Sequence, residues 1–328
     1  MNNVFHTLVE SADLDSLLRE VDALCERRDY DGLFMLTRMC RLAVERGKQL
    51  WPIAEHITYR LVLEGPPEVA GPLVQPGAGR FAPGPLAEVA ASTHTFAELA
   101  EHLPSAQTRE HVAAERVLRG EDLSGDPRAH PPVVEVPLRL LDFEPPYRVA
   151  TYLKDHVETQ EPSTSFGPAV AIAGPGEVVD DDDLEAALMD LVRPWFEESA
   201  GHARAVVIEG DALQAIGSLG WDEAAVREIK FAEALELMGW AAASGGMHGR
   251  RRGAAFGRFA AWWAAAEICG MAWPPEPDQL EAEGSKLDWL AFERPTADQS
   301  GWRLGLACSS PPEGWAWALH AQDVLEDV

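Results

Sequence analysis

The chain has 328 residues, 46% hydrophobic and 25% charged, a composition typical of a folded protein and not of a disordered chain. Its 54 acidic residues outnumber 27 basic ones, and the net charge of −27 argues against general nucleic-acid binding because it repels nucleic acid at long range. No apolar run reaches the roughly 18 residues that a membrane span needs, so we predict a soluble, cytoplasmic protein.

The first part of the chain shows helical periodicity without a strand signal. Apolar residues spaced by three and four predict a helix over residues 14–25, with Asp13 or Asp15 as its N-cap. The same spacing predicts helices over residues 33–45 and 51–63. After a turn-rich stretch, three shorter helices are predicted at residues 85–91, 95–103 and 108–118.

The second part of the chain mixes both kinds of element. Short branched or apolar runs predict strands at residues 169–173, 203–209, 288–293, 302–308 and 315–320. Apolar periodicity predicts helices at residues 183–196, 222–240 and 256–269. The last two strands are expected to form a hairpin at an edge of the sheet, with Trp315 and Trp317 as an exposed aromatic patch.

These patterns predict an α+β fold. A helical N-terminal bundle, or a HEAT-like stack of helix pairs, is followed by a mixed α/β domain that ends in an antiparallel hairpin. The predicted boundaries are residues 1–125 for the helical domain, 126–146 for a Gly- and Pro-containing linker, and 147–328 for the mixed domain.

The leading candidate for a binding site is the basic, glycine-rich segment 244–258. Glycines let backbone amides converge on one point, and arginines donate paired hydrogen bonds to phosphate or carboxylate. The candidate anion-binding residues are Gly246, His248, Gly249, Arg250, Arg251, Arg252 and Arg258. A surface loop whose arginines meet the protein's own acidic face is the alternative interpretation.

Two familiar nucleotide loops do not fit this segment. The segment is not a Walker A loop, because no Gly-Lys-Ser/Thr follows the glycines. It is not the dinucleotide-binding fingerprint, because the preceding residues are predicted to form a helix and not a strand. The run Arg250-x-x-Gly253-x-Ala255 resembles the pyrophosphate-binding signature of acetyl-coenzyme A N-acetyltransferases. That resemblance implies acetyl-coenzyme A as a cofactor, held by these three residues.

Weaker candidates lie elsewhere in the chain. Glu209 and Asp211 follow a predicted strand, a place where open α/β sheets put ligand-binding groups and where a plain turn is also common. Glu88 and His94 belong to a group of acids and histidines, but we predict no metal site, because a capping box from Thr95 leaves His94 outside the helix.

A dense charged cluster is the last of these weaker candidates. Glu115, Arg116 and Arg119 stand close together near the end of a predicted helix. We favour internal ion pairs that lock the helices and the linker over a ligand site here.

Three stretches carry a resemblance to other proteins. Gly84 to His94, Glu115 to Leu123 and Pro312 to Leu319 resemble segments of a family of uncharacterised proteins from high-GC actinobacteria. The resemblance implies no activity and assigns no functional residue.

The function expected from the sequence is that of a non-enzymatic, acidic interaction protein. Its loop 244–258 is expected to bind an anionic group, carried by a partner protein or a phosphorylated small molecule. One alternative is an enzyme that holds acetyl-coenzyme A at that loop, with Glu209, Asp211 or His248 as general base. A second alternative is an acidic mimic of nucleic acid.

Overall fold

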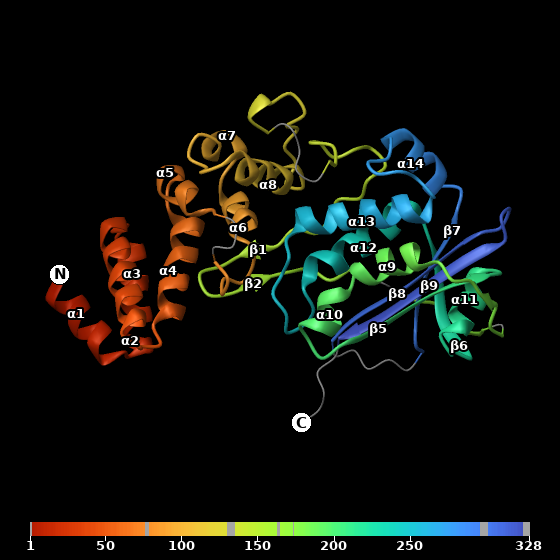
Figure 1. Cartoon of the computed structure of the whole chain (residues 1–328), viewed down its shortest axis with the longest axis horizontal. Helices are drawn as coiled ribbons and strands as arrows, with labels where there is room; N and C mark the ends of the chain where they lie inside the picture. The colour runs from red at the N-terminus through yellow and green to blue at the C-terminus, as the bar shows by residue number, and fades with distance from the viewer. Residues whose placement is uncertain are drawn as a thin grey trace. The chain divides into compact units, whose positions relative to one another are not determined.

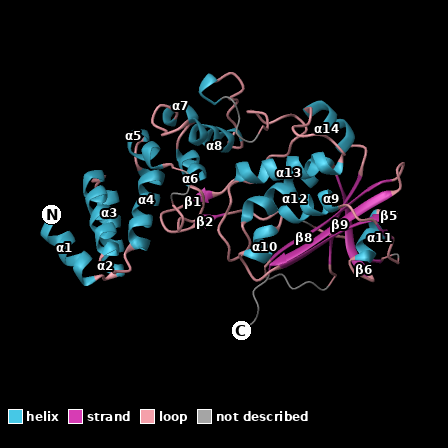
Figure 2. Ribbon diagram, viewed as in Figure 1, coloured by secondary structure: helices cyan, strands magenta, loops and turns pink. Residues whose placement is uncertain are grey.

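The computed structural model describes residues 2–75, 79–129, 135–162, 165–172, 174–295 and 301–323. The predicted α+β fold class is confirmed, since helices precede a mixed region with an antiparallel sheet and a final hairpin (Figure 2). The chain forms two compact units, which we call the helical unit (residues 1–133 and 150–159) and the mixed unit (residues 134–149 and 160–328) (Figure 1). No helix in the described part of the chain is long and apolar enough to cross a membrane.

The helical unit begins with four helices around one apolar core. They are α1 (Asn2–Ser11), α2 (Leu14–Glu26), α3 (Tyr30–Glu45) and α4 (Trp51–Glu64). The three helices predicted here are confirmed, and α1 is an addition that the sequence analysis missed. Asp13 caps α2 by accepting a hydrogen bond from the Ser16 amide, and Leu17, Val21 and Leu24 are buried below it.

Shorter helices complete this unit. They are α5 (Pro67–Ala70), η1 (Gly71–Leu73), α6 (Leu86–Thr93), α7 (Phe96–Leu99), α8 (Ala106–Val117) and η2 (Pro127–Ala129). The two-stranded pair β1 (Thr151–Tyr152) and β2 (Val157–Glu158) joins them from the later segment. The Tyr152 hydroxyl donates a 2.6 Å hydrogen bond to buried Glu88, and any side chain at Gly84 would collide with that hydroxyl.

The mixed unit is built on a seven-stranded sheet in which every neighbouring pair is antiparallel. Its strands are β3 (Ala169–Ala171), β4 (Glu177–Val178), β5 (His202–Glu209), β6 (Glu223–Ile229), β7 (Asp288–Glu293), β8 (Trp302–Ser310) and β9 (Trp315–Asp323). Their order across the sheet is β3-β6-β7-β8-β9-β5-β4. The predicted β8-β9 hairpin is confirmed, but it occupies the middle of the sheet and not an edge, because β7 and β5 pair with its outer sides.

The two faces of this sheet are covered differently. Three helices, α9 (Asp182–Asp190), α10 (Arg193–Glu197) and α12 (Phe231–Ser244), pack on one face, and α13 (Ala254–Ile268) packs against α12 and α9 (Figure 2). On the opposite face, α11 (Ala212–Ser218) packs against residues such as Val206, Ile208 and Ala316. The remaining helix of this unit, α14 (Pro277–Gly284), precedes β7. The expected exposed patch is wrong, since Trp317 is fully buried in the core under α12 and α13.

One predicted helix is half wrong. Residues 222–240 were expected to be helical throughout, but Glu223–Ile229 form strand β6 and the helix begins only at Phe231. The alanines and glutamates of β6 favour a helix locally, whereas pairing with β3 on one side and β7 on the other satisfies the backbone of this segment.

The segment expected to be a linker contributes to the mixed unit. Residues 130–134 lie outside the described residues, while Val136 and Leu138 from the following stretch are buried. Residues 134–149 are assigned to the mixed unit, and residues 150–159 return to the helical unit. The chain therefore passes between the two units more than once.

Candidate functional site

Within the basic segment 244–258, residues 245–253 connect α12 to α13. Gly245 and Gly246 both adopt left-handed backbone conformations, with φ of 71° and 84°. A side chain at Gly249 would collide with the Gly245 carbonyl, since its Cβ would lie 1.8 Å from that oxygen. The helix expected before this segment is present as α12, so the loop follows a helix and not a strand.

The amide side of this loop faces a carboxylate of the protein itself. The Met247 amide donates a hydrogen bond to Oδ2 of Asp323, and the Ser199 hydroxyl donates one of 3.0 Å to Oδ1. Asp323 is completely buried, and a Cβ at Gly246 would lie 2.9 Å from its Oδ2. The turn at Gly246 thus brings the Met247 amide to a carboxylate, with the last residue of β9 as the anion.

Arg258 is also paired inside the protein. Its Nε and Nη2 donate hydrogen bonds of 2.7 and 2.6 Å to the two carboxylate oxygens of Glu144, and both side chains are almost entirely buried. The remaining donors reach the carbonyls of Pro137 at 2.8 Å and Arg139 at 2.9 Å. Arg258 therefore fastens residues 137–144 to α13, and its guanidinium is not directed at a ligand.

The other basic residues of the loop are engaged to different degrees. Arg251 is buried, Arg250 is half-buried, and both interact with other groups of the protein. Arg252 lies over the Phe256 ring, with Cζ 3.6 Å from the ring centre, and burial lowers the pKa of its guanidinium. His248 is exposed. The loop is held largely by internal partners.

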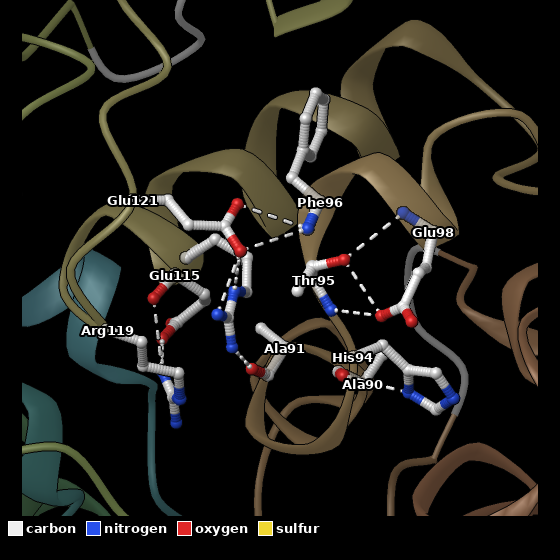
Figure 3. A network of polar contacts seen from close by, with 10 residues as sticks. Ala90, Ala91, His94, Thr95, Phe96, Glu98, Glu115, Arg119 and Glu121 are labelled. Atoms are coloured by element: carbon white, nitrogen blue, oxygen red, sulfur yellow. Dashed lines mark hydrogen bonds and ion pairs between the residues drawn. The ribbon is translucent and has the colours of Figure 1, made fainter.

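The acidic and basic candidates of the helical unit form a network of internal contacts (Figure 3). Arg119 pairs with Glu115 at 3.1 Å and lies 3.9 Å from Glu88. Arg116 pairs with Glu121 at 2.8 Å, and Glu121 also accepts a hydrogen bond from the Phe96 amide. The predicted internal ion pairs are therefore present and connect α6, α7 and α8.

His94 ends α6 and lies outside the helices on either side. Its Nε2 is 3.0 Å from the Gly65 carbonyl, and its Nδ1 contacts the Ala90 carbonyl at 3.3 Å. The predicted capping box of α7 is confirmed, because Thr95 and Glu98 exchange side-chain to backbone hydrogen bonds. Within the described ranges no three His, Cys, Asp or Glu residues are placed to hold a metal ion.

Glu209 and Asp211 lie at the end of β5, at the turn into α11. Asp211 caps α11, accepting a 2.9 Å hydrogen bond from the Gln214 amide, while the Gln214 side chain accepts from the Asp211 amide. Glu209 is exposed at the end of its strand. This arrangement is a helix-capping turn, and it accounts for Asp211 without a ligand.

A different group of basic residues lies beside α11, on the same face of the sheet. We call it the sheet pocket: two adjoining hollows, of about 350 and 160 Å³, on the face of the sheet opposite α12 and α13. Its charged and polar lining residues are His202, Arg204, Glu293, Arg294, Arg303, His320 and Gln322. None of these residues was a candidate in the sequence analysis.

Strand register explains why the sheet pocket forms. Across β5, β9 and β8, Arg204 pairs with His320, which pairs with Gly305, and the adjacent row joins His202, Gln322 and Arg303. Side chains two residues apart on a strand share a face, so both rows point to the same side of the sheet. A Cβ at Gly305 would lie 2.0 Å from the Phe292 carbonyl, so this position tolerates only glycine.

The electrostatics of the sheet pocket favour an anion. Burial, and then the positive charges of His202, Arg294 and Arg303, lower the pKa of His320 to about 4. Arg294 lies over the Trp221 ring, with Cζ 4.9 Å from its centre. Glu293 is the one carboxylate among the described lining residues, and burial raises its pKa although Arg303 acts against that rise.

The sequence carries a signal for this pocket, but an incomplete one. His202 and Arg204, and likewise His320 and Gln322, are polar residues at alternating positions within or beside predicted strands. Alternation shows that each pair shares a face, whereas the register that joins the pairs across three strands is visible only in the folded sheet.

Comparison with known proteins adds a family but no activity. The model of the family described as "Family of unknown function (DUF6183)" matches residues 15–324. No curated protein and no solved structure matches the chain. The resemblance to actinobacterial proteins stays a prediction.

Proposed function

Because the chain belongs to DUF6183, a family of unknown function, we propose its function from the geometry of the sheet pocket. The protein is a non-enzymatic, cytoplasmic binding protein that holds the phosphate group of a partner or small molecule in this pocket. The observation that carries the proposal is the meeting of Arg204, Arg294 and Arg303 with His202 and His320 on one open sheet face.

The charge of the whole chain makes this local arrangement selective. A net charge of −27 repels extended polyanions, while guanidinium groups close to one hollow attract a small anion that fits between them. Guanidinium groups bind phosphate oxygens through paired, charge-assisted hydrogen bonds. The pocket therefore suits a phosphate group better than a long nucleic-acid backbone.

The test is a calorimetric titration of the full chain with inorganic phosphate, together with its melting temperature. We expect saturable binding and a rise of the melting temperature with phosphate concentration. Arg204→Gln should weaken binding about ten-fold, the effect of losing roughly 1.4 kcal/mol of charge-assisted hydrogen bonding. Arg139→Gln, an equal charge change at an exposed side chain outside the pocket, is the matched control.

Two further arms separate the sources of the phosphate. A phosphopeptide and a nucleoside monophosphate each compete with inorganic phosphate, and the tighter of the two identifies a protein partner or a small molecule. Absence of binding by phosphate and by both competitors, or equal loss in Arg204→Gln and Arg139→Gln, contradicts the proposal.

The loop 244–258 remains a second place for such a ligand, with less support. A ligand at the Met247 amide has to displace Asp323, and Arg258 has to leave Glu144. Binding of coenzyme A that is lost in Arg252→Gln and kept in Arg204→Gln would favour the loop and the acetyl-coenzyme A enzyme. Competition with DNA for a basic protein would favour the nucleic-acid mimic.

A further inference from the structure

Another hollow of the mixed unit lies on the face of the sheet that α9 covers, at the end where β8 turns into β9. Its volume is about 620 Å³, which falls within the range of roughly 300–1,000 Å³ that is typical of small-molecule sites. We call it the acidic pocket, after the carboxylates that line it. We propose that the acidic pocket binds a small organic amine, an ammonium group carried on an apolar body. It shares no lining residue with the sheet pocket, so its ligand is independent of the phosphate proposed there.

The walls of the acidic pocket are largely apolar. Leu184 of α9, Val207 of β5 and Ile268 of α13 line it, and all three are buried. Leu287 and the ring of Trp315, both half-buried, line it as well. An apolar body in the pocket leaves water and packs against these side chains. A metal ion makes no use of such walls, and within the described ranges no three His, Cys, Asp or Glu residues are placed to hold one.

The charge of the acidic pocket is complementary to a cation. Four carboxylates line it, each from a different segment of the chain: Asp181, Glu267, Glu283 and Glu313. Lys286 is the one basic residue among the described lining residues, and its Nζ pairs with Glu283 at 2.7 Å. Carboxylates that outnumber the one lysine around an apolar hollow focus a negative potential into it, and that potential attracts a positively charged ligand.

Glu267 is the carboxylate that lacks a partner in the protein. The other three accept hydrogen bonds from the Leu184 amide, the Trp315 indole and the Lys286 ammonium. The side chain of Glu267, which is half-buried, forms no hydrogen bond or ion pair with a described residue. Burial, and then the charges of two aspartates at the start of α9, raise its pKa. An ammonium group beside Glu267 donates the hydrogen bonds that this carboxylate lacks and relieves the repulsion.

The same lining distinguishes between kinds of ammonium group. Recognition of a quaternary ammonium uses the faces of several aromatic rings, and Trp315 is the one aromatic residue among the described lining residues. Glu267 instead needs an N–H donor. The acidic pocket therefore suits a primary or secondary amine better than a quaternary one.

The experiment compares three probes by calorimetry on the full chain: phenethylamine, phenethyl alcohol and ethylamine. The alcohol keeps the apolar body without the charge, and ethylamine keeps the charge with little apolar body. We expect phenethylamine to bind about ten-fold more tightly than either, because it alone uses both the carboxylate and the walls. Glu267→Gln should weaken phenethylamine about ten-fold and leave the alcohol unchanged. Glu281→Gln, an equal charge change at an exposed side chain of α14 outside the pocket, is the matched control.

A second variant keeps the test decisive if Glu267→Gln fails to fold. Lys286→Gln removes the competing ammonium of the protein and should tighten phenethylamine several-fold, whereas Lys230→Gln, at an exposed residue outside the pocket, should not. Absence of phenethylamine binding, or equal affinities for the amine and the alcohol, overturns the proposal. Equal losses in Glu267→Gln and Glu281→Gln overturn it too, because they show attraction to the acidic surface as a whole and not to this pocket.

Discussion

Replacing Glu144 with leucine removes the carboxylate that neutralises Arg258 inside the mixed unit. The two side chains are 0% and 4% exposed and share two hydrogen bonds of 2.6 and 2.7 Å. Glu144 also accepts a 2.9 Å hydrogen bond from the Trp262 indole. The substitution leaves a buried guanidinium without its counterion, although the carbonyls of Pro137 and Arg139 remain.

The expected loss in free energy of unfolding is about 3–5 kcal/mol, the cost of breaking a buried ion pair from one side. Two charge-assisted hydrogen bonds at about 1.5–3 kcal/mol each lead to the same range. The double variant Glu144→Leu/Arg258→Met should recover most of the loss, because it removes the uncompensated charge and keeps the volume apolar.

Urea denaturation followed by tryptophan fluorescence measures this loss of stability in the mixed unit. Every tryptophan except Trp51 belongs to the mixed unit, so the fluorescence change reports its unfolding. Far-ultraviolet circular dichroism follows the whole chain, and separate transitions by the two probes show whether the units unfold independently. A loss below 1 kcal/mol in Glu144→Leu, or a double variant no more stable than the single one, refutes the reasoning.

Two further predictions concern the sheet pocket and the helix layer. Because the folded pKa of His320 is about 4 against roughly 6.5 unfolded, the unfolded state gains a proton first as pH falls. Stability should therefore drop by about 2 kcal/mol between pH 7.5 and 5 relative to His320→Gln in paired urea titrations, and parallel pH profiles contradict this. Gly257→Ala places a Cβ 2.2 Å from the Gly239 carbonyl, so α13 must move from α12 at a cost of about 1–3 kcal/mol. Thermal melts should show this loss, with little change in Gly167→Ala, which has open space; equal melting temperatures exclude the clash.

Local patterns predicted much of the helical unit. The periodic apolar residues of α2 to α4 and the caps at Asp13 and Thr95 depend on contacts within a few residues, so the sequence carries them directly. The β8-β9 hairpin was also predictable, because its two strands are close in sequence and joined by a short turn. The same locality explains the failure at β6, whose helix-favouring residues are held extended by β3 and β7.

The sequence by itself determined the fold class, the basic loop and the charge of the chain. Only the tertiary structure decided which basic residues line the sheet pocket. Arg258 pairs with Glu144, more than a hundred residues earlier in the chain, and the Met247 amide of the loop donates a hydrogen bond to Asp323, so these two donors of the basic segment are occupied within the protein. Arg204 and Arg303 reach one pocket through the register of β5, β9 and β8. Pairing between distant segments sets that register, and no local propensity encodes it.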